Sequence, residues 1–531
     1  MCATPSRVTP PCAPTEGHLP CHAVHGSCCV WSLHDPHPSF ACRFAQLEDP
    51  TKIPASVKKS LESIHPDEVH PLNLFRIHWY NSEDRAGMSD VPGHLLLPES
   101  LTGVKAPIYV ALGERFPMVN VHKVLAAYSC LVPRLIDGRF DPTLHKAVWP
   151  STGNYCRGGV AVSKIMGCRG VAILPEEMSK ERFDWLEQWT QNPEEDVIKT
   201  PGGEANVKEI YDKCAELAAD PDNIIFNQFA EYGNALGHYG VTGAALGHIY
   251  KHAQSSNKNL ELFAYTSATG SAGTLSAGDR LKDDFGAKIC CVESSQCPTL
   301  LANGFGDHNI QGIGDKHVPL IHNVMNTDYV AGISDEATDS LAYLFNHPEG
   351  KRFLVERRGV PAELVECLSS FGYSGIANVL AAIKIAKHHD LNENQALITV
   401  ATDGFALYQD EAPRILQRRF GGHFDMTSAA EAYGRFLLGV QTNDFMECTS
   451  KDRERMFNLG YFTWVEQQGI DIKHFKERKS QSFWNGLRPL LKYWDKEIDK
   501  FNAEIDDPQM EGVLTPEYAS AGMSKGMKSK L

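Results

Sequence analysis

Apolar, strand-like runs alternate with longer helical patterns along most of this 531-residue chain, and that alternation constrains the fold more than any other feature. The run APIYVALG at 106–113 precedes the helical pattern VHKVLAAYSCLV at 121–132. The helical GVAVSKIMG at 159–167 then precedes the strand-like CRGVAILP at 168–175. Strands that alternate with helices of this length indicate βαβ units. The sequence therefore predicts an α/β fold with mostly parallel sheets.

The alternation continues through the middle of the chain. A helical pattern at 207–220 is followed by further strand-like runs, LELFAYT at 260–266, KICCVE at 288–293 and ALITVATD at 396–403. Ligands of such folds bind beyond the carboxyl ends of the parallel strands, and several small-residue turns fall at these points. We therefore expect the binding site to be built from those turns.

Charge and hydropathy limit the class of partner. The formal net charge is −15 and the pI is about 5.8, which argues against nucleic acid and anionic membrane surfaces. No apolar run approaches the roughly 18 to 20 residues that span a bilayer. We expect a small-molecule substrate, no nucleic acid and no membrane.

The first residues differ in composition from the rest. Residues 1–50 are rich in Pro, His and Cys, and six of the fifteen cysteines lie in the first 42 positions. The candidate zinc ligands there match no paired-ligand spacing; they are Cys21, His22, His25, Cys28 and Cys29. We expect no metal site, and we predict that 1–50 is a disordered or targeting extension.

The remaining chain divides into three predicted parts. Residues 51–445 carry the alternating pattern and form the catalytic region, and 446–510 form a helical, aromatic-rich C-terminal appendix. Residues 511–531 are a flexible tail that ends in Ser529-Lys530-Leu531, a tripeptide that peroxisomal import receptors read in eukaryotes. The expected location is thus peroxisomal if the chain is eukaryotic, and otherwise cytoplasmic.

The turn within YTSATGSAGTLSAGDRL, from Tyr265 to Leu281, is suited to holding a phosphate. Its small residues let backbone N–H groups approach an anion, and the following helix adds partial positive charge. Taken alone, it fits a nucleotide, a dinucleotide, a phosphorylated cofactor or a plain strand-to-helix connection.

Further motifs join this turn in a fixed order. They are NVHK (120–123), PSTGNY (150–155), NQFAEYGNALGHYGVTG (227–243), IQGIGDKHVPLI (310–321), GYSGIANVLAAIKIA (372–386) and TVATDGFALY (399–408). Their order and spacing over roughly residues 100 to 410 resemble the cysteine synthase and tryptophan synthase β-subunit family. These are the fold-type II pyridoxal phosphate enzymes, and the resemblance implies two α/β lobes and bound pyridoxal phosphate.

The resemblance also assigns roles around the cofactor. It implies that Lys123 forms the Schiff base and moves protons, that Asn154 binds the phenolic oxygen of the ring, and that Ser374 faces the pyridine nitrogen. The implied phosphate cradle is Gly270, Ser271, Ala272, Gly273 and Thr274. Without the resemblance, Lys123 reads as a surface lysine and the other two as helix caps.

A second set of residues is implied to face the substrate. Ser151, Thr152 and Gly153 would bind its carboxylate at a helix N-terminus. Tyr155, Gly312 and Asp315 would border the same side of the ring. Tyr155 replaces the usual threonine, Asp315 replaces a small residue, and Ser271 and Ala272 replace threonine and glycine. These departures affect the substrate prediction most, although Asp315 also fits a turn cap.

The resemblance implies β-replacement on a small amino acid through an aminoacrylate intermediate, as in cysteine biosynthesis. Alternatives are β-elimination, as in a serine or threonine dehydratase or a cysteine desulfhydrase, and a non-catalytic pseudoenzyme. A nicotinamide-binding protein is disfavoured, because no GxGxxG follows the first strand with an acidic residue about 20 positions on. The resembled family also leads us to expect a homodimer.

Overall fold

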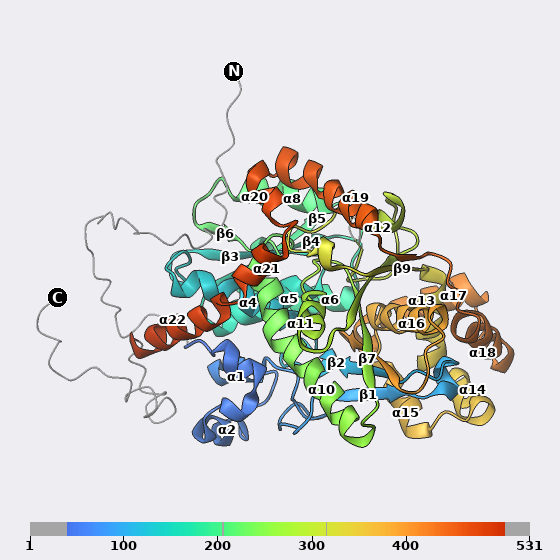
Figure 1. Ribbon diagram of the computed structural model, residues 1–531. Coiled ribbons are helices and arrows are strands. Elements are labelled where there is room, and N and C mark those ends of the chain that lie inside the picture. The colour runs from blue at the N-terminus through green and yellow to red at the C-terminus, as the bar shows by residue number, and fades with distance from the viewer. Residues whose placement is uncertain (1–39, 204–206, 315, 505–531) are drawn as a thin grey trace, which may run out of the picture.

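The computed structural model describes residues 40–203, 207–314 and 316–504 (Figure 1). The candidate zinc ligands, the C-terminal tripeptide and Asp315 lie outside these ranges, so the predictions made for them remain predictions.

A seven-stranded sheet forms the larger half of the fold. Its strand order is β1-β2-β10-β7-β8-β9-β11. The strands are β1 (His94–Leu97), β2 (Ile108–Leu112), β7 (Glu261–Ala268), β8 (Lys288–Ser294), β9 (Tyr329–Ile333), β10 (Gln395–Ala401) and β11 (Phe445–Glu447). The five inner strands are parallel, and only the edge strands β1 and β11 pair antiparallel. The inner strands read as continuous apolar runs because both of their faces are buried.

A second, four-stranded sheet is parallel throughout, in the order β5-β4-β3-β6. Its strands are β3 (Lys146–Pro150), β4 (Arg169–Pro175), β5 (Val197–Thr200) and β6 (Asn223–Ile225). The predicted α/β fold with mostly parallel sheets flanked by helices is therefore confirmed.

Four helices begin at or just after the small-residue turns noted in the sequence. They are α4 (Lys123–Ile136), α5 (Asn154–Ile165), α11 (Ser276–Phe285) and α16 (Tyr373–His388). Helix α16 is buried over most of its length and is tied to the sheet on which it packs. The Asn378 side-chain amide donates to the carbonyl of Val400 in β10 at 2.9 Å, and the backbone carbonyl of Asn378 accepts from the Thr266 hydroxyl of β7 at 3.0 Å.

The other α-helices surround the two sheets or lie near the two ends of the described chain (Figure 1). Before β9 they are α1 (Phe44–Glu48), α2 (Ala55–Leu61), α3 (Glu99–Thr102), α6 (Lys180–Trp189), α7 (Pro193–Asp196), α8 (Val207–Leu217), α9 (Tyr232–Gly237), α10 (Gly243–Ser256) and α12 (Thr299–Ala302). After β9 they are α13 (Asp335–Asn346), α14 (Pro348–Arg358), α15 (Ala362–Cys367), α17 (Glu411–Phe420), α18 (Met426–Tyr433), α19 (Ser450–Tyr461), α20 (Ile472–Glu477), α21 (Gln481–Leu487) and α22 (Leu490–Glu504).

No single helix in the described ranges is long and apolar enough to cross a membrane. One bent pair, Ala362–Ser370 with Tyr373–His388, meets the length and composition criteria at an angle of 119°.

The predicted C-terminal helical region is present, and it packs on the α/β core. Trp464 is 1% exposed, and its indole N–H donates to the carbonyl of Val318 at 2.7 Å. In Figure 1 these helices run from α19 and α20 at the top of the view to α22, which lies beside α1. The Asn502 side chain of α22 exchanges two hydrogen bonds of 2.9 Å with the backbone of Ala41. The C-terminal helices thus contact both the core and the first described residues.

Candidate active site

Lys123 begins α4 beside the small-residue turn that follows β7. Its Nζ donates to Gln228 Oε1 at 3.0 Å and to Ser271 Oγ at 3.3 Å. A lysine placed in this way faces the turn and does not extend into bulk solvent. The surface-lysine reading therefore does not describe Lys123.

The structure brings the predicted site residues together around one cavity. All of them line it except Gly153, which lies between two lining residues, and Asp315, which is outside the described ranges. Other lining residues were not assigned from the sequence; they include His122, Gln228, Phe229, Ile313 and Thr402. These residues lie within the sequence motifs described above. Their place in the cavity depends on contacts between distant segments, such as that of Lys123 with Gln228, and such contacts leave no local pattern in the sequence.

The predicted phosphate cradle has room for backbone but little room for side chains. A Cβ on Gly273 would lie 2.2 Å from Asn234 Oδ1, and a Cβ on Gly270 would lie 3.1 Å from the carbonyl oxygen of Gly312. Ala272 adopts a left-handed φ of +63°. Left-handed residues within a turn direct successive N–H groups toward one point, which is the geometry that binds anions.

The loop before α5 is held by a buried arginine. Arg182 Nη1 donates to the carbonyl of Thr152 at 3.0 Å, and a Cβ on Gly153 would lie 2.5 Å from Arg182 Cδ. Gly153 also has a φ of +145°, which residues with a side chain rarely adopt. Glycine at this position therefore lets the Ser151–Gly153 loop approach the arginine and present its backbone at the start of α5.

Asn154, the first residue of α5, is held at both ends of its amide. Its Nδ2 donates to Asp403 Oδ2 at 2.7 Å, and its Oδ1 lies 3.4 Å from Arg157 Nη1. Asp403 is 1% exposed; burial raises its pKa, against the lowering effect of hydrogen bonds from Tyr408 and Asn154 and of nearby arginines. Sequence reasoning did not assign Asp403, although its position directly after β10 marks it as a residue at the carboxyl edge of the sheet.

Ser374 lies at the start of α16 and bonds to a second hydroxyl. Its Oγ is 2.6 Å from Thr402 Oγ1, and both side chains line the cavity. Among the described residues that line the cavity, none is a carboxylate. A group facing Ser374 therefore meets hydroxyls and not a negative charge.

Tyr155 lines the cavity but directs its hydroxyl into the protein. The hydroxyl donates to the carbonyl of Phe226 at 3.1 Å, and the ring packs edge-on against Trp149 at 5.5 Å. Burial raises the pKa of Tyr155 well above its ordinary value. The hydroxyl of Tyr155 is therefore engaged by the backbone of the protein.

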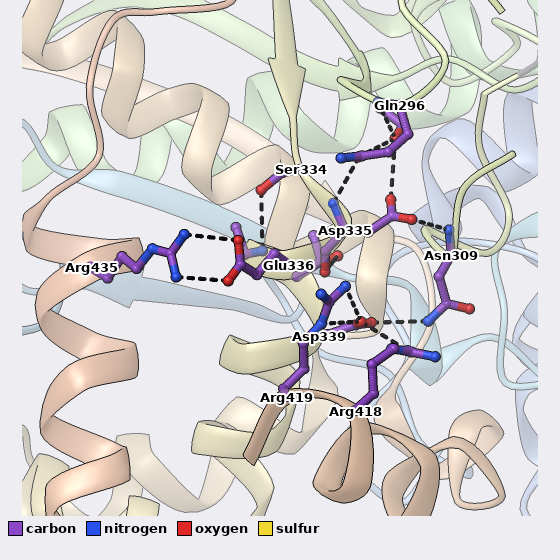
Figure 2. A network of polar contacts seen from close by, with 12 residues as sticks. Gln296, Asn309, Ser334, Asp335, Glu336, Asp339, Arg418, Arg419 and Arg435 are labelled. Carbon is purple, nitrogen blue, oxygen red and sulfur yellow. Dashed lines mark hydrogen bonds and ion pairs between the residues drawn. The ribbon is translucent and has the colours of Figure 1, made fainter. Parts of the chain in front are cut away.

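The loop that carries Gly312 is fixed at both ends, and Figure 2 shows the contacts of Asn309 at its start. At its start, the Asn309 backbone N–H donates to Asp335 Oδ2 at 2.6 Å, and the Asn309 amide donates to Asp339 Oδ1 at 2.9 Å. At its end, the Gly314 N–H donates to the carbonyl of Thr269 at 2.8 Å. Helix α13 and the cradle therefore hold the two ends of the loop.

Comparisons with known proteins agree with this geometry. Residues 120–345 match the family model described as pyridoxal-phosphate dependent enzyme. The resemblance seen in the sequence is confirmed. Pyridoxal phosphate is therefore the cofactor of this site.

Curated proteins similar in sequence to this chain include cysteine synthases and cystathionine beta-synthases. A cysteine synthase of Staphylococcus aureus is 27% identical over 297 residues, covering 56% of this chain and 85% of the relative. The cystathionine beta-synthase of Saccharomyces cerevisiae is 24% identical over 339 residues, covering 62% of each. The solved O-acetyl serine sulfhydrylase isoform 3 from Entamoeba histolytica is 20% identical, with a TM-score of 0.50 over 64% of this chain and 92% of that one. At this identity the structural likeness concerns the fold.

The residues present fit pyridoxal phosphate. A Cβ at Gly270 or Gly273 would crowd Gly312 or Asn234, so glycine at these positions lets the backbone of the turn lie close to its neighbours, as in turns that bind a phosphate through backbone N–H groups. Lys123 offers an amine to an aldehyde, while Asn154 and Ser374 offer polar groups to ring atoms in the same cavity. The donor set thus matches an aldehyde, a phosphate and a substituted pyridine.

Proposed function

We propose that this protein carries out β-replacement on a small amino acid, in the manner of a cysteine synthase. The observation that carries the proposal is the cavity in which the amine of Lys123, the phosphate-type turn and the hydroxyl of Ser374 meet without a carboxylate among the described lining residues. The names of the sequence relatives, cysteine synthase and cystathionine beta-synthase, support the same class.

When bound, pyridoxal phosphate supplies an electron sink for negative charge at the substrate α-carbon. A hydroxyl such as Ser374, unlike a carboxylate, does not hold a proton on a pyridine nitrogen, and this favours loss of a β-substituent over transamination. The Ser151–Gly153 loop lies at the N-terminus of α5, where the positive end of the helix dipole favours the substrate carboxylate.

Lys123 Nζ is the group that moves the proton. It lies between Gln228 Oε1 and Ser271 Oγ, which hold the amine in a defined direction inside the cavity. An amine in this position removes the α-proton of the substrate and later returns a proton to the product.

A substrate panel tests the proposal. The purified protein is given serine, O-acetylserine, O-phosphoserine, threonine or cysteine, each with and without sulfide. We expect a new amino acid that appears only when sulfide is present and one donor is supplied. Pyruvate or 2-oxobutyrate with ammonia, formed equally without sulfide, would identify a lyase and refute β-replacement.

The site of cofactor attachment is tested separately. Borohydride reduction followed by peptide mapping is expected to place the label on the peptide that contains Lys123. The variant Lys123→Ala should bind the cofactor without a reducible linkage. A label on another lysine would refute the role given to Lys123.

A further inference from the structure

The carboxylate of Asp403 lies directly behind the cavity and has no role in the function proposed above. It follows β10, and its side chain is completely enclosed by protein: Asp403 is 1% exposed. Its Oδ2 accepts hydrogen bonds from Asn154 Nδ2 at 2.7 Å and from the Tyr408 hydroxyl at 2.6 Å. Its Oδ1 lies 3.4 Å from Thr402 Oγ1, which is at the edge of hydrogen-bond distance.

The contact with Asn154 determines how that amide is oriented. The nitrogen of a side-chain amide donates two hydrogen bonds, whereas its oxygen only accepts them. Each end of the amide therefore requires a different kind of neighbour. A carboxylate accepts only, which requires the nitrogen of Asn154 to face Asp403. Arg157 donates only, and it lies on the oxygen side of the same amide at 3.4 Å. The two charged side chains thus specify the same orientation.

Within the described ranges, the Asn154 amide nitrogen donates one hydrogen bond, to Asp403, which leaves its second N–H for another acceptor. Asp403 takes one of the two amide hydrogens, and the other remains for whatever lies in the cavity that Asn154 lines. A flipped amide would present its oxygen there and would repel a phenolate oxygen. The direction of donation from Asn154 therefore depends on Asp403.

The surroundings indicate that Asp403 is kept for this contact and not for a tight ion pair. The nearby arginines, Arg157 and Arg182, are both buried and lower the pKa of Asp403 through their charge, but within the described ranges no hydrogen bond or ion pair joins either of them to the carboxylate. Each donates instead to a backbone carbonyl, Arg157 to Val119 at 3.3 Å and Arg182 to Thr152 at 3.0 Å. The two short bonds to the carboxylate come from uncharged donors, which are Asn154 and Tyr408.

From this geometry we propose that Asp403 is a positioning residue that directs one N–H of Asn154 at the phenolic oxygen of bound pyridoxal phosphate. The proposal rests on the cofactor and deepens the proposed function, but it does not depend on which amino acid is the substrate. It concerns the ring end of the cofactor and not the substrate. Cofactor binding and spectroscopy therefore test it.

Three variants separate positioning from other roles. Asp403→Leu keeps the bulk and removes the acceptor, whereas Asp403→Asn keeps an acceptor oxygen and removes the charge. Tyr408→Phe is the matched control, because it removes the other short bond to the same carboxylate oxygen and leaves Asn154 untouched. Circular dichroism establishes that each variant is folded before it is compared.

The measurements are the absorbance spectrum of the bound cofactor and the dissociation constants of pyridoxal phosphate and of pyridoxal, which lacks the phosphate. We expect Asp403→Leu to shift the spectrum and to weaken both ligands by about tenfold, roughly 1.4 kcal/mol. Equal weakening places the loss at the ring end. We expect Asp403→Asn to restore most of both properties, and Tyr408→Phe to leave the spectrum unchanged.

Other outcomes would overturn the proposal. Equal damage in Asp403→Asn and Asp403→Leu would mean that the charge, and not the acceptor, matters. A loss confined to pyridoxal phosphate would place the effect at the phosphate end. An unchanged spectrum in folded Asp403→Leu would refute positioning outright. None of these results depends on turnover, so a failure of β-replacement would remain distinguishable.

Discussion

Replacing Asp339 by alanine should destabilise the protein far more than replacing Glu336 by alanine, although both lie on α13 and both contact arginine (Figure 2). The Asp339 side chain is fully buried and accepts from Arg418 and Arg419 at 2.9 Å, as well as from Asn309. Glu336 makes a two-pronged contact with Arg435 at 2.7 and 2.9 Å, but its side chain is 39% exposed.

The expected magnitudes follow from this difference in burial. Removing one partner of a buried ion pair costs about 3 to 5 kcal/mol. Arg418 and Arg419 are 42% and 23% exposed, so water recovers part of that loss, and about 2 to 4 kcal/mol is expected for Asp339→Ala. An exposed pair contributes at most about 1 kcal/mol, which is the limit for Glu336→Ala.

Two measurements compare the variants. Urea unfolding gives the free energy of unfolding of each variant, and hydrogen exchange reports the local stability of α17, which carries Arg418 and Arg419. Asp339→Ala should accelerate exchange in α17 and in the loop that begins at Asn309, whereas Glu336→Ala should affect neither. The Glu336 contribution should also fall as salt is added, because exposed charges are screened. Similar losses in the two variants, or a salt-sensitive Asp339, would refute the reasoning from burial.

Three further outcomes are expected. Gly273→Ala should abolish cofactor uptake, as absorbance can measure, because the new Cβ would lie 2.2 Å from Asn234 Oδ1 and distort the turn. Gly434→Ala is the control: its new Cβ would have no atom within 4 Å, and this variant should bind the cofactor normally. Burial raises the pKa of Glu293 from 4.5 to about 7, so the folded state holds a proton that the unfolded state releases. Stability should therefore fall between about pH 4.5 and 7, and unfolding midpoints of Glu293→Gln should lack that slope; an identical slope would contradict the assignment. Trp464→Phe should cost about 1 kcal/mol through the lost bond to Val318, and Trp464→Ala about 3 to 5 kcal/mol, as calorimetry or urea unfolding can measure; no change in either would show that the C-terminal helices are not coupled to the core.

The sequence predicted the inner strands β2, β4, β7, β8 and β10 because burial on both faces makes them continuous apolar runs, but it missed the short inner strands β3 and β9. The run at 106–113 contains β2, and that at 168–175 contains β4. The edge strands escaped prediction for the opposite reason. β11 has only three residues, and it exists as a strand because it pairs with β9, more than a hundred positions earlier.

The same distinction separates the site residues that were predicted from those that were not. Lys123, Asn154 and Ser374 lie in motifs whose order could be compared with a family, and the structure places all three around one cavity. Asp403 and Gln228 contribute through side-chain contacts with residues far away in the sequence, Asn154 and Lys123. Such contacts arise from the fold, and no local period or spacing encodes them. Tyr155 was predicted to border the substrate side of the ring and does line the cavity, but the hydrogen bond from its hydroxyl to the backbone of Phe226 could not be read from the sequence.

The pairing of α1 with α22 bears on how the chain is made. The backbone of Ala41 contacts the side chain of Asn502, and the N–H of Phe44 donates to Asp495 at 2.6 Å, so the first described residues complete their contacts with the last described helix. Ribosomes add about 5 to 20 residues per second, so the segment around Phe44 must wait tens of seconds for its partner to be synthesised. Until α22 is made, Phe44 lacks its ring contact with Trp494, whose centroid lies 5.6 Å from that of Phe44 in the folded protein. Closure of α22 onto α1 is therefore a late event in folding, because it must follow synthesis of nearly the whole described chain.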